Sequence, residues 1–207
     1  MTGTDPKAGD WNERYAGAEQ VWSGQPNAAL VAEVGALAPG RALDVGCGEG
    51  ADAIWLAGRG WRVTALDVST VALERARTAA AQAGVDVEWT HAGLLEATLP
   101  LGAFDLVSAQ YPALLRSPGR DAERALLAAV APAGHLLVVH HELTDAAIER
   151  ARAHGFDPDD YVSPGDVAAV LDGGWLIEAD ELRPRSVSGG AGAHHHHDIV
   201  LHARRLP

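Results

Sequence analysis

Short apolar runs alternate with amphipathic, alanine-rich stretches along the chain. Runs typical of strands lie at 41–46, 62–68, 86–92, 104–111, 135–141, 175–182 and 198–205. Strands that alternate with helical patterns are typical of a parallel sheet covered by helices on both faces. The pattern therefore predicts an α/β fold with seven strands.

Helix signals mark the boundaries of two of the helical stretches. The stretch 69–84 opens on Ser69, with Thr70 as the alternative cap, and ends at Gly84. The stretch 163–174 opens on a serine and a proline and ends in two glycines, so we expect its helix to continue up to those glycines.

The last two apolar runs are joined differently from the others. Only the Gly/His-rich stretch 183–197 lies between them, and it has no helical pattern. Strands joined without a crossover helix pair antiparallel, so we expect a final hairpin with a long loop.

Composition and charge limit the classes of function. With 207 residues, 47% of them hydrophobic, the chain can bury one core, and we predict a single domain over 1–207. A formal charge of −12 disfavours a nucleic-acid partner, because such binding depends on clustered cations. No apolar run is long enough to span a bilayer, so we expect no membrane partner and a cytoplasmic location, as a monomer or a homodimer.

The strongest chemical signal is the stretch ALDVGCGEGADA at 42–53. A strand that ends in Gly46, Gly48 and Gly50 and then opens a helix lets a ligand approach the backbone and its free amides. The next strand ends at Asp67, 17 residues after Gly50, where a carboxylate can accept both hydroxyls of a ribose. Together they predict an adenosine ligand; the alternative is a tight turn followed by a helix cap.

LDVGCGEG followed by VTALDVS resembles the core of class I S-adenosylmethionine-dependent methyltransferases. The resemblance implies a Rossmann-like α/β sheet of seven strands, mostly parallel with the last strand antiparallel, and helices on both faces. It also implies S-adenosylmethionine as the cofactor. The glycine loop and the acid before it would hold the amino-acid end of the cofactor. The acid at the end of the second strand would hold the ribose of the cofactor, and the two residues after that acid would border its adenine. These residues are Asp44, Gly46, Cys47, Gly48, Asp67, Val68 and Ser69.

Two positions depart from relatives in that family. Gly93 stands where many carry an aspartate that binds the adenine amino group, so the backbone from Gly93 and Leu94 to Leu95 would hold the adenine. The fourth strand ends in AQYP rather than in the turn of exocyclic-amine methyltransferases, which disfavours nucleic-acid and protein-glutamine substrates. Gln110 and Tyr111 should still face the cofactor, because strand ends flank the crevice in such sheets.

The segment 11–34 resembles the start of small-molecule methyltransferases related to tellurite-resistance and thiopurine enzymes. The resemblance implies a lid over 1–34 on a core of 35–207, with pocket candidates Trp11, Arg14, Tyr15 and Trp22. Arg14 and Tyr15 would organise catalysis and Trp11 and Tyr15 would touch the cofactor. The alternative is that these side chains only pack a helix onto the sheet.

Methyl transfer to a proton-bearing acceptor needs alignment, exclusion of water and a base. Tyr111, His140 and His141 are the candidates for the base. Each has an alternative role, as a cavity wall or as an ordinary residue at a strand end.

Four consecutive histidines, 194–197, precede the last strand and lie too far inside the chain for a purification tag. An antiparallel last strand beside the fifth would bring them to His140 and His141, near Glu142 and Asp198. The expected ligands of a divalent transition metal are His140, His141, His195 and His197. The alternative is a solvated loop.

The resemblance as a whole implies methyl transfer from S-adenosylmethionine to a small-molecule acceptor, assisted by a histidine-bound metal if the loop binds one. A NAD-dependent oxidoreductase is the alternative enzyme, because GCGEGA also satisfies the loose glycine pattern of that fold. A non-catalytic cofactor- or metal-binding protein of the same fold is the third reading.

Overall fold

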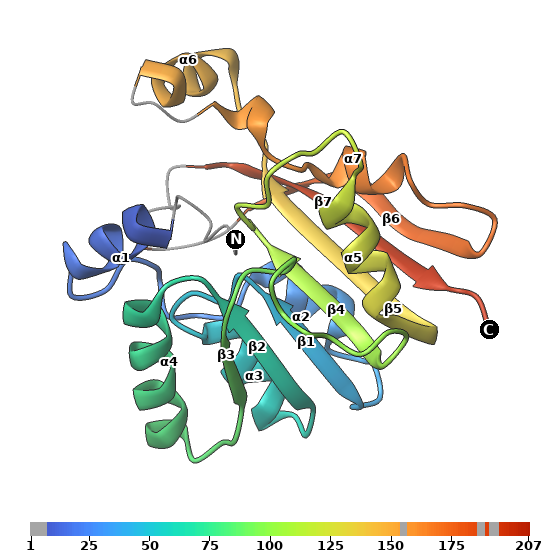
Figure 1. Cartoon of the computed structure of the whole chain (residues 1–207), viewed down its shortest axis with the longest axis horizontal. Helices are drawn as coiled ribbons and strands as arrows, with labels where there is room; N and C mark the ends of the chain where they lie inside the picture. The colour runs from blue at the N-terminus through green and yellow to red at the C-terminus, as the bar shows by residue number, and fades with distance from the viewer. Residues whose placement is uncertain (1–7, 154–156, 186–188, 191–194) are drawn as a thin grey trace.

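The computed structural model describes residues 8–153, 157–185, 189–190 and 195–207. This part of the chain contains a seven-stranded sheet of order β3-β2-β1-β4-β5-β7-β6 (Figure 1). β1 to β5 pair in parallel, and β7 lies antiparallel between β5 and β6, which confirms the predicted sheet and final hairpin. The strands are β1 (Arg41–Val45), β2 (Arg62–Asp67), β3 (Glu88–His91), β4 (Phe104–Gln110), β5 (Val130–His141), β6 (Trp175–Pro184) and β7 (His197–Arg205).

Helices cover both faces of the sheet and enclose two apolar clusters. Leu126 and Val167 belong to the cluster on one face, and Leu30 and Leu56 to the cluster on the other. Strands buried on both faces explain the nearly continuous apolar runs in the sequence. The helices are α1 (Ala8–Ala16), α2 (Ala28–Val34), α3 (Ala51–Gly58), α4 (Thr70–Ala83), α5 (Asp121–Ala129), α6 (Asp145–Ala153), the 3-10 turn η1 (Pro158–Asp160) and α7 (Pro164–Ala168).

The expected limits of α4 are confirmed, whereas those of α7 are wrong. Ser69 caps α4, and Gly84 ends it in the left-handed conformation. α7 starts in a capping box at Ser163 but ends at Ala168, well before the two glycines. There Asp172 accepts a hydrogen bond from the Gly174 amide at 2.9 Å, and this local turn leads directly into β6.

The N-terminal segment lies over the start of α4, at the carboxyl edge of the parallel strands (Figure 1). Asn12 in α1 accepts a hydrogen bond of 2.7 Å from the Ser69 hydroxyl, which links α1 to the cap of α4. The segment therefore stands next to the glycine-rich turn after β1. Within the described residues, no helix combines the length and the apolar character needed to cross a bilayer.

Candidate active site

The glycine-rich turn between β1 and α3 requires glycine for two separate reasons. Gly48 and Gly50 have φ angles of 53° and 84°, a region that side-chain-bearing residues rarely adopt. A Cβ atom at Gly48 would lie 2.8 Å from the Tyr15 hydroxyl, and one at Gly50 would lie 2.7 Å from the Trp89 ring. The turn is thus both left-handed and tightly packed from behind.

Asp44, at the end of β1, is the most deeply buried carboxylate of the site. It is 1% exposed, and among the described residues its Oδ2 atom has no hydrogen-bond partner. Burial, followed by the neighbouring charges of Asp52 and Asp67, raises its pKa well above the usual range. An ammonium donor beside Asp44 would supply both the missing bond and the missing countercharge.

Asp67, at the end of β2, is already hydrogen-bonded to the backbone. Its two oxygens accept from the amides of Gly48 and Ser69, both at 2.8 Å. Burial raises its pKa, partly offset by these bonds. Each carboxylate oxygen can accept a further hydrogen bond, so ribose hydroxyls could still bind Asp67.

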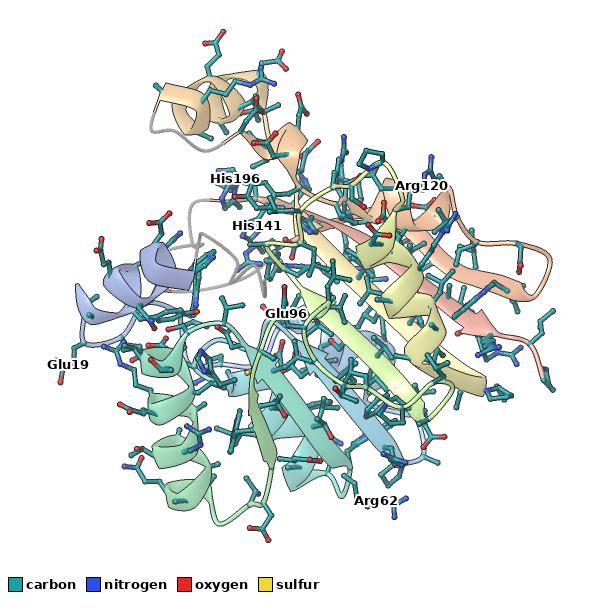
Figure 2. The ribbon with its side chains drawn as sticks, viewed as in Figure 1. Glu19, Arg62, Glu96, Arg120, His141 and His196 are labelled. Atoms are coloured by element: carbon teal, nitrogen blue, oxygen red, sulfur yellow. The ribbon has the colours of Figure 1, made fainter. Side chains whose placement is uncertain are left out.

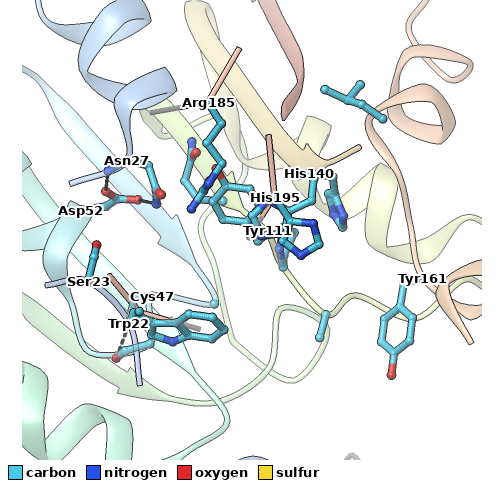
Figure 3. Close-up of a pocket in the computed structure, with 18 of the residues that line it drawn as sticks. Trp22, Ser23, Asn27, Cys47, Asp52, Tyr111, His140, Tyr161, Arg185 and His195 are labelled. Atoms are coloured by element: carbon cyan, nitrogen blue, oxygen red, sulfur yellow. Dashed lines mark hydrogen bonds between the residues drawn. The ribbon is translucent and has the colours of Figure 1, made fainter. Parts of the chain in front are cut away.

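Two adjoining cavities lie beside these carboxylates, and both are lined by Trp11, Gly46 and Tyr111. The larger has a volume of about 920 Å³ and the smaller about 220 Å³. Of the predicted residues, the larger is also lined by Arg14, Asp44, Cys47, Gly48, Gln110, His140, His141 and His195 (Figure 3). The smaller is also lined by Asp67, Val68, Gly93 and Leu94.

Tyr15, Ser69 and His197 are predicted site residues that line neither cavity. Tyr15 is 3% exposed, and its hydroxyl accepts a bond of 2.9 Å from the Trp22 indole. It therefore supports Gly48 from behind, and its contact with the cofactor stays a prediction. Ser69 is the cap of α4, and His197 pairs with Glu142 at 3.1 Å.

Arg14 contacts both tryptophans of the predicted lid. Its guanidinium lies 5.1 Å from the ring centres of both Trp11 and Trp22, and all three side chains line the larger cavity. Cation–π contact on two aromatic faces holds the three together.

Two residues that the sequence analysis missed attach this segment to the glycine turn. Glu49 accepts hydrogen bonds from the amides of Val21 and Trp22 and forms an ion pair of 2.8 Å with Arg75. Arg75 also donates to the backbone carbonyls of Tyr15 and Ala18. Arg75 follows an ordinary helical pattern, so nothing local distinguishes it from a solvated arginine. Glu49 lies within the glycine motif at 42–53, and this position could have identified it as a residue of the site.

The far wall of the larger cavity is a stack of rings. The Tyr111 and His141 ring centres are 4.1 Å apart, and those of His141 and His195 are 3.9 Å apart. Tyr111 has a positive φ of 52°, a costly conformation for a bulky residue. His195 of the histidine run therefore meets His141, at the end of β5, in the crevice, as the topology predicted.

Asp198 contacts two rings of this stack, those of Tyr111 and His141. It accepts a bond of 2.8 Å from the Tyr111 hydroxyl, lies 3.1 Å from Nδ1 of His141 and pairs with Arg185. Burial alone would raise the pKa of Asp198, but these partners outweigh burial and lower it. Burial and the Asp198 charge raise the pKa of Tyr111, so the phenol stays neutral.

His140 has a different environment from its neighbour. Among the described residues its Nε2 atom has no hydrogen-bond partner, and burial, followed by the nearby His141, lowers its pKa to about 4. A ring that resists protonation this strongly is a poor base near neutral pH.

The structure does not bring the four predicted metal ligands together. In the described part of the chain, the ligand atoms of His140, His141, His195 and His197 are not among those that lie close enough together to hold a metal. Instead, His141 and His195 stack face to face, and His197 pairs with Glu142. Within the described residues, the group of metal-ligating atoms that lie close together is His135, Glu178 and His202, elsewhere on the sheet. His194 lies outside the described residues.

An acid does occur near Gly93, but at a different position from the family's aspartate. A Cβ atom at Gly93 would collide with the Glu96 carboxylate, which folds back over the loop after β3 (Figure 2). Glu96 also lines the smaller cavity with Gly93 and Leu94. The adenine end of the predicted site thus has a carboxylate that the sequence analysis did not identify.

Comparisons with known proteins agree with this geometry. A family model described as a methyltransferase domain matches residues 42–134. An uncharacterized methyltransferase of Mycobacterium tuberculosis is 40% identical over 97 residues, 47% of this chain and 48% of that protein. The matched region covers about half of the chain and about half the length of the curated relatives it matches.

Two solved structures are similar over nearly the whole chain. One, described as the conversion of a disulfide bond into a thioacetal group during echinomycin biosynthesis, has a TM-score of 0.75 and 26% identity and covers 96% of this chain and 92% of its own. The N-methyltransferase NodS from Bradyrhizobium japonicum WM9, in complex with S-adenosyl-l-homocysteine, has a TM-score of 0.72 and 18% identity and covers 98% and 100%. The fold around the crevice is shared with these proteins.

Proposed function

We propose that the protein transfers a methyl group from S-adenosylmethionine to a small molecule. The proposal starts from the similarity of the chain to class I methyltransferases. The observation that carries the proposal is the buried Oδ2 atom of Asp44, which lacks a partner among the described residues and lies beside the glycine turn. A cationic ligand with an ammonium group would satisfy this atom and offset the charge of Asp44, Asp52 and Asp67.

The residues present fit that cofactor. Asp44 and the turn from Gly46 to Gly48 would hold its amino-acid end, while Asp67 would accept the ribose hydroxyls. The smaller cavity would hold the adenine, with Glu96 taking the place of the absent aspartate beside Gly93. When bound, S-adenosylmethionine supplies a methyl group that is already activated. The chain has to orient the acceptor, exclude water and receive a proton.

The rest of the larger cavity is the proposed acceptor site. Ala147, Ile148 and Ala151 of α6 give it an apolar wall, and Arg116 and Arg185 give it cationic groups. A cavity of this mixed character suits an organic acceptor with an apolar body and a polar reacting group. The resemblance of segment 11–34 to the tellurite-resistance and thiopurine group favours the same class and a lid that shields the acceptor.

His141 is the proposed base. Asp198 beside its Nδ1 atom would stabilise the imidazolium that forms when His141 takes a proton from the acceptor. His140 and Tyr111 suit this role less well, because burial lowers the pKa of the first and raises that of the second. Tyr111 and Arg185 act as positioning residues, since both bind Asp198.

The test has two parts. Calorimetry with S-adenosylmethionine, its demethylated product and NAD should show binding of the first two only; binding of NAD alone would replace the proposal with the oxidoreductase. A screen of thiols, amines, phenols and chalcogen oxyanions then identifies the acceptor. Binding of the cofactor without turnover of any acceptor would favour a non-catalytic protein.

The base is tested on the acceptor found in that screen. We expect His141→Gln to lower kcat by a factor of about 10² to 10⁴ while calorimetry shows unchanged cofactor affinity. His196→Ala, an exposed neighbour in the same run, is the control and should keep full activity. Equal turnover of His141→Gln and the control would remove His141 from the chemistry.

A further inference from the structure

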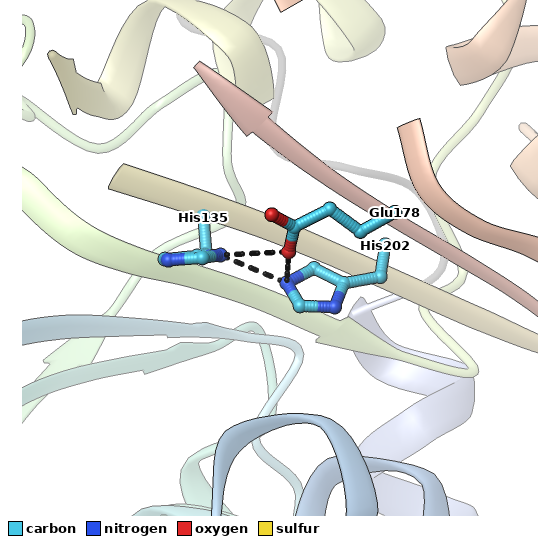
Figure 4. Close-up of side chains that lie close together, drawn as sticks. All are labelled: His135, Glu178 and His202. Atoms are coloured by element: carbon cyan, nitrogen blue, oxygen red, sulfur yellow. Dashed lines mark hydrogen bonds and ion pairs between the residues drawn. The ribbon is translucent and has the colours of Figure 1, made fainter. Parts of the chain in front are cut away.

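A second cluster of metal-ligating side chains lies away from the crevice. Nδ1 of His135 is 2.9 Å from Nε2 of His202, and the Oε2 atom of Glu178 is 3.6 Å and 3.5 Å from these two nitrogens (Figure 4). The three residues come from β5, β7 and β6, three neighbouring strands. Their ligand atoms therefore form a small triangle on one face of the sheet.

The sheet register places all three on that face. His202 is opposite Leu137, and residues two apart on a strand share a face, so His135 lies on the same side as Leu137. Glu178 is the extra residue of a β-bulge, because Ile177 pairs with Ala203 while Ala179 pairs with His202. A bulge redirects a side chain, and here it turns the Glu178 carboxylate toward the histidines.

We propose that His135, Glu178 and His202 bind a divalent transition metal, zinc in the first place, with water as the fourth ligand. Zinc bonds to nitrogen and carboxylate oxygen are about 2.0–2.2 Å long in tetrahedral sites, so two ligand atoms lie roughly 3.3 Å apart. The three observed separations bracket this value. Two histidines and one glutamate are also a ligand set that zinc prefers.

The surroundings orient each ligand for this role. Nδ1 of His202 lies 2.8 Å from the Glu33 carboxylate of α2, which directs the Nε2 lone pair toward His135 and Glu178. Arg204 donates to the other oxygen of Glu178 at 2.9 Å, leaving Oε2 for the metal. Carboxylate–histidine–metal contacts of this kind raise the basicity of the ligand.

The proposed metal has a structural role. His135 precedes His141 of the crevice by six residues along β5, a separation of roughly 20 Å. The metal would therefore join β5, β6 and β7 of the C-terminal hairpin, and through Glu33 it would join them to α2. It would take no part in methyl transfer.

The experiment has to separate this site from the histidine run, which can also bind metal. Protein without a purification tag is loaded with zinc, dialysed and measured for bound zinc by mass spectrometry. We expect about one tightly bound equivalent, lost in His135→Asn and in Glu178→Gln, and retained when His194 to His197 are all replaced by asparagine. Added zinc should raise the melting temperature of the native chain and of the variant with His194 to His197 replaced by asparagine, here called the run variant. It should not raise the melting temperature of His135→Asn or Glu178→Gln.

A milder variant, Glu33→Gln, and a spectroscopic probe, cobalt(II), test the proposal even if His135→Asn fails to fold. Glu33→Gln removes the carboxylate that pairs with both His202 and Arg183, and it should weaken zinc binding by about 10- to 100-fold. Cobalt(II) in the native protein should give the intense visible bands of a tetrahedral site. The proposal is overturned if the native protein binds no zinc tightly and shows no cobalt bands. It is also overturned if the run variant loses bound zinc while His135→Asn retains it. In either case His135 and His202 would form only a hydrogen bond.

Discussion

Single buried polar groups determine which ligand the crevice can accept. Asp44 and Asp67 are both largely enclosed by protein, yet one lacks a hydrogen-bond partner among the described residues while the other has two backbone partners. A carboxylate without a partner favours a cationic ligand, whereas a carboxylate already fixed in place can position hydroxyl groups.

The ribose role of Asp67 is tested by Asp67→Ala. Loss of a charged acceptor for two hydroxyls should weaken S-adenosylmethionine binding by roughly 2 to 4 kcal/mol. Calorimetry measures the effect, and Asp86→Ala, an exposed acid beyond α4, is the control that should bind normally. Unchanged affinity in folded Asp67→Ala protein would contradict the assignment of this carboxylate to the ribose.

The buried ring of His140 makes stability depend on pH. Its pKa of about 4 in the folded protein lies below the value of about 6.5 in the unfolded chain, so the unfolded chain binds more protons between these limits. Its contribution to stability is complete above about pH 6.5 and is lost as the pH falls toward about 4. Denaturant unfolding should show a loss of about 2 kcal/mol between about pH 7.5 and about pH 5.

His140→Phe keeps the ring and removes the titration. We expect this variant to show a smaller decline over the same pH interval, while His196→Ala, which alters an exposed histidine, declines as the native protein does. An identical decline in all three proteins would mean that other groups cause it.

At the scale of elements, the N-terminal segment is attached to the core through α4 and the glycine turn. Arg75 of α4 and Glu49 of the glycine turn hold the chain between Tyr15 and Trp22. We therefore expect that loss of these contacts loosens the segment while the sheet stays folded.

Arg75→Ala should release the segment without unfolding the core. We expect faster amide hydrogen exchange in residues 8–22 and reduced turnover, with a loss of global stability of about 1 kcal/mol or less, because the ion pair is partly exposed. Arg77→Ala, on an exposed position of the same helix, should change neither quantity. If exchange in 8–22 stays slow in Arg75→Ala, these contacts do not hold the segment.

The packing of the glycine turn predicts a difference between two glycine variants of similar backbone conformation. Gly50 and Gly84 both have positive φ, but a Cβ at Gly50 would meet Trp89 and Ala76, whereas one at Gly84 has nothing within 4 Å. Gly84→Ala should cost about 1–2 kcal/mol from backbone strain alone. Gly50→Ala should cost clearly more in denaturant unfolding, and equal costs would show that packing behind the turn is loose.

At the scale of the whole molecule, negative charge and ligand binding are linked. The formal charge is −12, and three of the acids, Asp44, Asp52 and Asp67, are buried beside the crevice with raised pKa values. A cation bound there would relieve their mutual repulsion and so stabilise the fold.

Thermal unfolding tests this linkage. At about 100 times its dissociation constant, S-adenosylmethionine should stabilise the protein by about 2.7 kcal/mol, or roughly 5–10 °C in Tm. The demethylated product lacks the sulfonium charge and should give a smaller shift at equal concentration. Asp44→Asn should reduce both shifts. An equal or larger shift with NAD would contradict a methyltransferase site.

The sequence by itself determined the features that depend on neighbouring residues in the chain. Alternating apolar runs set the strands of the sheet, Ser69 and Gly84 set the limits of α4, and the positive φ angles after β1 required the glycines. The limits of α7 could not be obtained in this way, because a turn at Asp172 competes with the helix. The place of His195 beside the crevice followed from topology alone.

Tertiary structure decided which side chains meet and how they turn. The sequence placed His141 and His195 together, but their orientation, with the two rings stacked face to face, comes only from the structure. Glu33 lies 169 positions from His202 in the chain, and Arg75 lies 57 from Ala18. No local pattern relates residues so far apart, because their contact depends on strand register, a bulge and the packing of helices on the sheet.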